Sequence, residues 1–260
     1  MKIDNKNYIK EFWDNQAKKF KGSHNASWGD IYAIDLEIKN IANYIKKGSS
    51  ILDVGCANGY STFKHLSKHP KSITGVDSSE SMIKYANINK KKLKVDDKVK
   101  FYVRDIRDLQ FKDESFDLTY TTRVLINLEN WEQQIIAINE CLRVTKKNGM
   151  VIFSEAFWEP LTLLNSMRTL MRLSPLVEQD FNKYLKMEKF NAYLNEKKIR
   201  YEIIDFSSLY YLGSRFLREI VTPYKKYKGY SNPINKLFFD IEQEYSGGGF
   251  GIQQAYVIYK

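Results

Sequence analysis

A short apolar strand that ends in a glycine-containing loop limits the fold of this chain more than any other feature. The stretch SILDVGCANGYS at 50–61 has the pattern of a buried parallel strand that turns directly into a helix. Gly55 and Gly59 permit positive φ and a close approach of the backbone. Asp77 ends a second apolar strand, where an acidic residue can accept both hydroxyls of a ribose. Strand, glycine loop, helix, strand and acid together predict a nucleoside-binding α/β fold.

The composition of the loop narrows the kind of nucleoside. The loop reads GCANG, so the GxGxxG fingerprint of dinucleotide sites is absent. Asp53 stands just before the first glycine, at the mouth of the predicted site. Its carboxylate would oppose a pyrophosphate but suit the ammonium group of an amino acid. The pattern therefore favours a nucleoside that carries an amino acid.

Four motifs follow one another along the chain: DVGCANG, GVDSS, VRDIRDL and FDLTYTTRVLINL. In kind and spacing they resemble the motifs of the class I S-adenosylmethionine-dependent methyltransferases. The resemblance implies S-adenosyl-L-methionine as cofactor and S-adenosyl-L-homocysteine as product. It places the ribose on Asp77, the adenine amino group on Asp105 and the Ile106 backbone, and the methionine end on Asp53. The remaining predicted cofactor residues are Gly55, Cys56, Ala57, Asn58, Gly59, Ser78, Met82 and Thr121.

Strands and helices alternate through the first two thirds of the chain, which predicts a parallel sheet with right-handed crossovers. We expect a Rossmann-like α/β fold with a seven-stranded sheet, mostly parallel, whose last strand is antiparallel. The expected strands lie near 50–54, 72–76, 99–103, 115–120, 149–154, 200–206 and 253–259. The expected core helices lie near 60–68, 79–91 and 131–145.

Helical patterns flank and interrupt this core. Residues 1–48 are predicted to form an N-terminal helical segment, and helices are expected at 160–173, at 180–196 and from about 208 to 245, with breaks at Pro223 and Pro233. The predicted division is a cofactor-binding core and a helical cap over the acceptor site. The core comprises 49–155, 200–206 and 250–260, and the cap comprises 156–199 and 207–249.

The charge and cysteine content limit the class of protein. The net charge of +10 suggests nucleic acid as a class of partner. Much of the excess of positive charge, however, lies in KKKLKVDDKVK at 90–100, and no RNA-binding module is evident. A solvated basic face or a small anionic substrate is the better interpretation. The two cysteines indicate neither a disulfide framework nor a metal site. No apolar run approaches the ~20 residues of a membrane span, so we expect a cytoplasmic protein.

The segment after the fourth strand indicates the atom that is methylated. It reads TTRVLIN at 121–127, without the Asn/Asp-Pro-Pro-Tyr/Phe motif that holds planar amines in amino methyltransferases. An oxygen acceptor is therefore expected, and a hydroxyl would gain from a general base. Glu155, at the end of the fifth strand, is the predicted base, with His24 as a second candidate. The alternatives are a capping or ion-pair role for Glu155 and a solvated loop position for His24.

Segments outside the cofactor motifs are similar to those of a bacterial methyltransferase subgroup associated with surface-polysaccharide or capsule assembly. They include HNASWGDIYAIDLE at 24–37, LNSMRTL at 164–170 and SSLYYLGSRFL at 207–217. The resemblance suggests an acceptor pocket whose arginines suit a phosphate or carboxylate and whose aromatic faces suit a sugar ring. Its predicted residues are Trp28, Arg123, Asn165, Arg168, Tyr210, Tyr211 and Arg215.

The sequence thus predicts an O-methyltransferase for a small anionic or sugar-containing acceptor. Two alternatives stay open at this point: an RNA methyltransferase, and a catalytically inactive methyltransferase-like binding subunit. The oligomeric state and the identity of the acceptor are not predicted.

Overall fold

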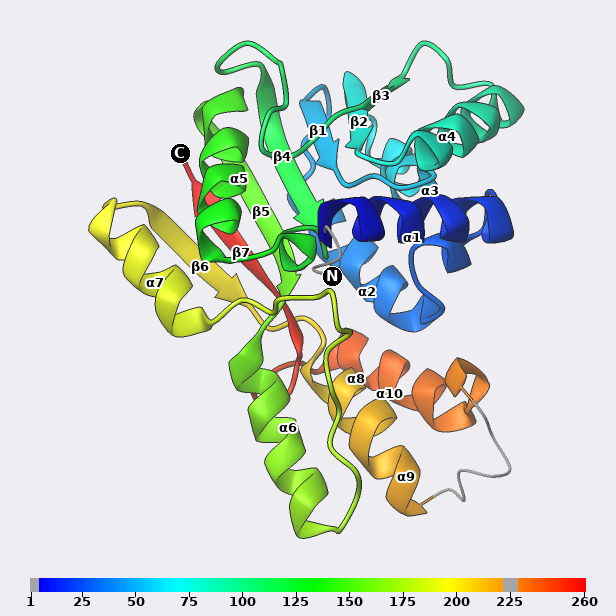
Figure 1. Cartoon of the computed structure of the whole chain (residues 1–260), viewed down its shortest axis with the longest axis vertical. Helices are drawn as coiled ribbons and strands as arrows, with labels where there is room; N and C mark the ends of the chain where they lie inside the picture. The colour runs from blue at the N-terminus through cyan, green and yellow to red at the C-terminus, as the bar shows by residue number, and fades with distance from the viewer. Residues whose placement is uncertain (1–4, 222–228) are drawn as a thin grey trace.

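The computed structural model describes residues 5–221 and 229–260. Its centre is a seven-stranded sheet in the order β3-β2-β1-β4-β5-β7-β6 (Figure 1). The first five strands pair in parallel, and β7 is antiparallel to both β5 and β6. This confirms the predicted Rossmann-like sheet. The strands are β1 (Ser50–Val54), β2 (Ser72–Asp77), β3 (Val99–Val103), β4 (Phe116–Thr122), β5 (Thr145–Ala156), β6 (Arg200–Ile204) and β7 (Gln253–Tyr259).

Helices cover both faces of the sheet. One face carries α2 (Ile31–Ala42), α3 (Tyr60–Lys64) and α4 (Glu80–Leu93), and the other carries α5 (Trp131–Val144) and α7 (Met187–Glu196). Successive side chains of a strand point to opposite faces. Accordingly, Ile51 packs in the cluster that contains Ile41 of α2, while Leu52 packs in the cluster that contains Ile138 of α5. Both faces of β1 are therefore buried, as its continuous apolar sequence requires.

The segment after β5 differs from the prediction. The helix predicted at 180–196 begins only at Met187, because the preceding chain runs extended beside the end of β5. Leu185 donates its N–H to Ala156 O, and Trp158 donates its N–H to Leu185 O. Phe190 of α7 is buried in the same cluster as α5, so this helix covers the sheet and does not belong to a cap over the acceptor site.

The other helices after β5 gather in a lobe below the sheet in Figure 1. The lobe contains α6 (Trp158–Leu170), α8 (Ser208–Leu212), a π-helical turn at Gly213–Leu217, α9 (Arg218–Val221) and α10 (Pro233–Glu244). Pro233 starts α10, with Asn232 as its N-cap. The predicted break at Pro223 lies outside the described residues.

The N-terminal helix α1 (Asn5–Phe20) lies between this lobe and the half of the sheet that carries β1 to β3 (Figure 1). It packs against α4, where Ser79 Oγ donates a 2.5 Å hydrogen bond to Asp14 Oδ1. The helix therefore runs across the carboxyl ends of the strands. In doubly wound folds ligands bind at this edge.

Candidate active site

The glycine loop after β1 has the shape that the sequence predicts. Gly55 and Gly59 have φ of 77° and 81°, in the left-handed region that favours glycine. A Cβ atom at Gly55 would lie 2.2 Å from Val124 Cγ2, and one at Gly59 would lie 2.8 Å from Phe63 Cε2. Backbone conformation and close packing therefore both require glycine at these two positions.

A cavity of about 350 Å³ opens beside this loop, at the carboxyl ends of β1 and β2. Predicted residues form part of its wall. Three side chains of α1 and two arginines after β3 also line it, and the sequence reasoning missed both groups. The predicted cofactor residues that line it are Gly55, Ala57, Asp77, Ser78, Met82, Asp105 and Ile106. The missed residues in these two groups are Ile9, Lys10, Trp13, Arg104 and Arg107.

Asp77 is held in place by the glycine loop itself. Its Oδ2 accepts the N–H of Ala57 at 3.0 Å, and its Oδ1 accepts the N–H of Ser79 at 2.9 Å. Burial raises the pKa of Asp77 to about 6, although these two hydrogen bonds oppose the rise. Each carboxylate oxygen can accept a further hydrogen bond, so the group can still bind two ribose hydroxyls.

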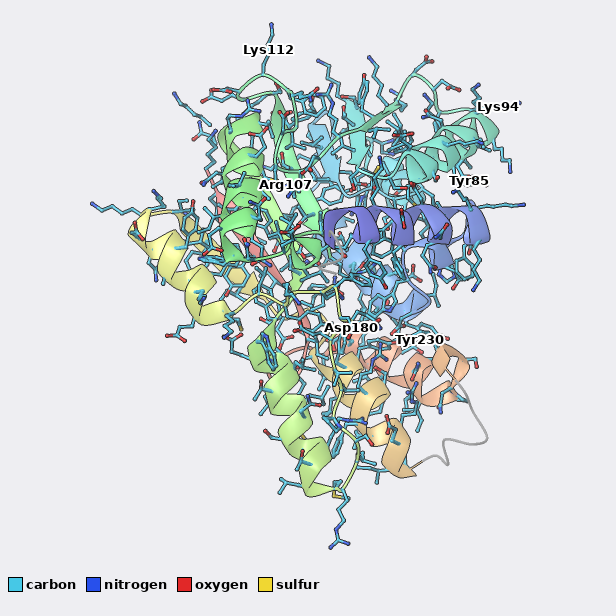
Figure 2. All side chains as sticks on the ribbon, viewed as in Figure 1. Tyr85, Lys94, Arg107, Lys112, Asp180 and Tyr230 are labelled. Carbon is cyan, nitrogen blue, oxygen red and sulfur yellow. The ribbon has the colours of Figure 1, made fainter. Side chains whose placement is uncertain are left out.

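Asp105 lies in the same cavity but in an ion pair. Arg107 Nη2 lies 2.5 Å from Asp105 Oδ2, and the N–H of Arg107 donates to Asp105 Oδ1 at 2.9 Å. Arg107 Nη1 also donates to Gln133 Oε1. Figure 2 shows Arg107 beside α5, near the end of α1. In the sequence, this ion pair is indicated only by the separation of two positions between Asp105 and Arg107.

Five predicted cofactor residues do not line the cavity. Asp53 is buried, accepts a 2.5 Å hydrogen bond from Thr62 Oγ1, and has a pKa that burial raises to about 6. Asn58 Nδ2 donates to the carbonyls of Lys21 and Ser23, which ties the loop to the end of α1. Asp53 and Asn58 therefore hold the surroundings of the site in place without lining the cavity. The five predicted cofactor residues that do not line it are Asp53, Cys56, Asn58, Gly59 and Thr121.

A second cavity of about 500 Å³ adjoins the first. Its walls come from α1, from the segment at 25–29, from the extended chain before α7, and from the lower lobe. Tyr230, one of its lining residues, lies at the top of the lobe below α1 in Figure 2. Four residues line both cavities, so molecules bound in the two would meet there: Trp13, Ser27, Arg123 and Asn127.

The predicted acceptor residues divide into two groups. Trp28, Arg123, Tyr211 and Arg215 line the second cavity. Asn165, Arg168 and Tyr210 do not line it.

These three residues stabilise the walls instead. Asn165 exchanges two hydrogen bonds with the backbone of Leu176, and buried Arg168 pairs with Glu219 at 3.0 Å. The Tyr210 hydroxyl donates to Asp30 Oδ1. Each of these side chains therefore has polar atoms that are occupied by other groups of the protein.

Both arginines of the second cavity are paired with buried carboxylates of one helix. Arg123 Nε donates to Glu37 Oε1 at 2.9 Å, and Arg215 Nη2 lies 2.5 Å from Asp30 Oδ2. Asp30 is the N-cap of α2, and Glu37 follows seven residues later on the same face. The sequence reasoning missed both acids, although their spacing on a predicted helix was a usable signal.

Neither predicted base lines either of these two cavities. Glu155 is fully buried, and its carboxylate accepts hydrogen bonds from Thr121 Oγ1 at 2.6 Å, from the Val124 N–H at 3.1 Å and from the Ile126 N–H at 3.5 Å. Burial raises the pKa of Glu155 to about 7 against the effect of these bonds. The prediction that it faces the crevice is wrong: Glu155 holds the loop that follows β4.

His24 is also misplaced for this role. Its Nδ1 lies 3.2 Å from the Trp28 carbonyl oxygen, its ring lies against Tyr60, and it lines neither cavity. The residues that line the second cavity include no carboxylate, histidine, lysine or cysteine. The described part of the chain therefore presents no carboxylate, imidazole, amine or thiol group to an acceptor there.

Other sequence expectations concern the surface. Lys94 and Lys112 lie at the end of the molecule opposite the lower lobe (Figure 2), and the lysine-rich stretch at 90–100 lines neither cavity. Across residues 5–221 and 229–260 there is no group of three acidic, histidine or cysteine side chains that could hold a metal ion. Within the same residues no helix is long and apolar enough to cross a bilayer.

Comparison with known proteins identifies the family. A family model described as a methyltransferase domain matches residues 45–208, more than half of the chain. The chain belongs to this methyltransferase family. It is an S-adenosylmethionine-dependent methyltransferase, which confirms the predicted enzyme class and cofactor.

Individual relatives agree with this assignment. Demethylmenaquinone methyltransferase of Staphylococcus aureus (strain MRSA252) is 32% identical over 181 residues, which cover 68% of this chain and 67% of that protein. The 27-O-demethylrifamycin SV methyltransferase of Amycolatopsis mediterranei (strain S699) is 27% identical over 117 residues, which cover 45% of this chain and 42% of that protein. The chain therefore spans less than half the length of that relative.

One solved structure matches almost the whole chain. The geranyl diphosphate C-methyltransferase of Streptomyces coelicolor A3(2) aligns with a TM-score of 0.63, covering 99% of this chain and 97% of that one at 14% identity. At this identity the match shows the fold.

Proposed function

We propose that this enzyme transfers a methyl group to an oxygen atom of a small acceptor bound in the second cavity. The observation that carries the proposal is the common wall of the two cavities, formed by Trp13, Ser27, Arg123 and Asn127. Holding two reactants in line can lower a barrier by roughly 7–11 kcal/mol. A site of this kind therefore acts chiefly by placing an acceptor oxygen next to the methyl donor.

The first cavity suits the nucleoside cofactor. Gly55 lines this cavity without a side chain, and Asp77 presents acceptor atoms at the end of β2. S-adenosylmethionine supplies an electrophilic methyl group on a positively charged sulfur. The glycine loop would pack against the cofactor, Asp77 would accept its ribose hydroxyls, and Asp105 with Ile106 would contact its adenine.

The second cavity suits a ring-bearing acceptor. Aromatic side chains from four parts of the chain line it, and among the described residues its charged groups are the two arginines. Aromatic faces pack well against flat or ring-shaped molecules. The missing proline motif after β4 supports oxygen rather than a planar amine as acceptor atom. The aromatic residues are Phe12, Trp13, Phe20, Trp28, Phe181, Tyr184, Tyr211 and Tyr230.

The biological setting stays a prediction from the sequence. The resemblance to methyltransferases of surface-polysaccharide assembly favours a sugar-containing or phosphorylated acceptor and a cytoplasmic reaction. The relatives named above act on a quinone, a rifamycin and a prenyl diphosphate, so small molecules are the common class.

Two measurements test the proposal. Isothermal titration calorimetry should detect binding of S-adenosylhomocysteine, and absence of binding would refute the assigned cofactor site. Methyl-labelled S-adenosylmethionine should then label a pool of nucleotide sugars and phosphorylated polyols. Label that enters bulk RNA and no small molecule would favour the RNA methyltransferase alternative. A gel shift with RNA at low salt, where phosphate-driven affinity is greatest, provides the matching control.

A further inference from the structure

We infer that the atom methylated is an oxygen already ionised in solution, of carboxylate or phosphate type, and that the guanidinium of Arg123 holds it. This inference rests on the proposed function and names the chemistry of its acceptor.

Position is the first argument. Of the four residues that line both cavities, Arg123 is the only charged one. It directly follows β4, and its backbone has φ of 56° and donates its N–H to Ser154 O. The guanidinium therefore lies where the acceptor oxygen and the methyl donor have to meet.

Orientation is the second argument. Glu37 is buried and fixes one edge of the guanidinium through Nε, while the flat face lies 4.6 Å from the centre of the Trp28 ring. Nη1 and Nη2 have no hydrogen-bond acceptor within residues 5–221 and 229–260. Two donors of a preoriented fork are thus available to an anionic oxygen.

Arg215 shows the contrast within the same cavity. Its Nη2 donates to Asp30 and its Nη1 donates to Ser214 Oγ, so both ends of its fork already have partners. The guanidinium lies between 5.1 and 6.0 Å from the ring centres of Tyr210, Tyr211 and Tyr230. Arg215 therefore forms part of the wall, and Arg123 is the arginine that can bind an acceptor.

The second cavity also lacks the usual proton acceptors. A neutral hydroxyl must lose a proton on methylation, and within residues 5–221 and 229–260 the side chains that line this cavity include no carboxylate, histidine or lysine to take it. The carboxylates of the first cavity, Asp77, Asp105 and Glu129, do not line the second. An ionised oxygen needs no base. The oxygen forms the bond to the methyl carbon, the carbon–sulfur bond breaks, its electron pair stays on sulfur, and no proton is released.

A binding experiment tests the role of Arg123 directly. Benzoate and benzamide have nearly the same shape and differ in charge, and each is titrated into enzyme saturated with S-adenosylhomocysteine. We expect wild type to bind benzoate at least tenfold more tightly than benzamide. Arg123→Gln should remove that preference and Arg123→Lys should reduce it. Glu37→Gln keeps an oxygen to orient Nε but removes the competing charge, so it should enlarge the preference.

The inference is overturned if wild type shows no preference for benzoate, or if Arg123→Gln retains it within twofold. Removing one member of a buried ion pair can prevent folding. If Arg123→Gln does not fold, the double variant Arg123→Gln/Glu37→Gln replaces it, because it leaves no unpaired buried charge. This double variant should also lose the preference for benzoate.

A transfer experiment tests the nucleophile without knowledge of the acceptor. A small-molecule extract is divided by anion exchange, and each fraction is incubated with enzyme and methyl-labelled S-adenosylmethionine. The retained fraction should supply the acceptor, and the labelled product should elute earlier because methylation removes one negative charge. Label that enters only the unretained fraction, or a product with unchanged charge, would overturn the inference. Absence of both labelling and S-adenosylhomocysteine binding would instead count against the proposed function.

Discussion

The two cavities share a wall but are built in different ways. Most of the wall of the first comes from short segments that follow β1, β2, β3 and β4, and these carry the recognisable motifs. The second is lined by segments as distant as Phe12 of α1 and Gln253 of β7. The cofactor site is therefore a local property of strand ends, whereas the acceptor site depends on how the lower lobe and α1 pack.

The electrostatics differ in the same way. The first cavity presents both carboxylates and cations, as a ligand with charges of both signs requires. The second presents two arginines, each backed by a buried carboxylate of α2. Most charged side chains of the first cavity thus lie at or just after the ends of strands. The charged side chains of the second are held by ion pairs between segments that are distant in the sequence.

The largest effect should come from the glycine loop of the first cavity. Gly55→Ala should lower the free energy of unfolding by about 2–4 kcal/mol, because a methyl group collides with Val124 and the backbone is strained. Gly48→Ala is the control, since Gly48 has φ of +82° but no atom within 4 Å of its Cβ position. It should cost only about 1 kcal/mol of strain. Equal losses in urea unfolding would show that packing against Val124 is unimportant.

The next effect concerns cofactor binding alone. Asp77→Ala should weaken S-adenosylhomocysteine binding by about 1.5–3 kcal/mol, since hydrogen bonds from the ribose to a charged acceptor are lost. Calorimetric titration measures this difference. Asp117→Ala removes a carboxylate that pairs with Lys146 at the opposite end of the sheet and should leave binding unchanged. Unaltered affinity in the Asp77 variant would mean that the first cavity is not the cofactor site.

Glu155 tests whether the wall between the cavities depends on a buried acceptor. Glu155→Gln should lower the free energy of unfolding by about 1–2 kcal/mol, because an amide NH₂ replaces one oxygen that accepts backbone N–H groups of the loop. Thr121→Val removes one donor to the same carboxylate and should be milder. Unchanged stability with a turnover reduced by 10² or more would restore Glu155 as the general base.

The smallest effect is a difference in pH dependence. The pKa of Glu155 is about 7 in the folded protein and lies near the ordinary value of 4.5 when the chain is unfolded, so the folded state binds more protons between these values. This group therefore contributes stability at low pH that is lost as the pH rises through 7. The free energy of unfolding, measured in urea at pH 6 and at pH 8, should fall between the two pH values by about 1 kcal/mol less in Glu155→Gln than in wild type. An equal fall in the two proteins would contradict the raised pKa.

The acceptor residues show where reasoning from sequence stopped. Trp28, Arg123, Tyr211 and Arg215 lie in the wall of the second cavity, but Arg168 and Tyr210 have the same residue types and are buried away from it. Residue type and resemblance indicate that a side chain can bind a ligand, but they do not show its direction. Direction here depends on partners such as Glu219 and Asp30, which lie far away along the chain.

The sequence by itself determined the sheet, the glycine loop and the place of Asp77. These follow from local rules: apolar runs form buried strands, glycine adopts positive φ without a Cβ atom that would collide in a crowded turn, and residues that end parallel strands meet at one edge. Only the tertiary structure decided that Glu155 holds a loop and that Arg123 is oriented by Glu37 at the junction of two cavities. The physical reason is that these roles depend on desolvation and on hydrogen-bond partners. Both arise from contacts between distant segments, and no local pattern in the chain encodes them.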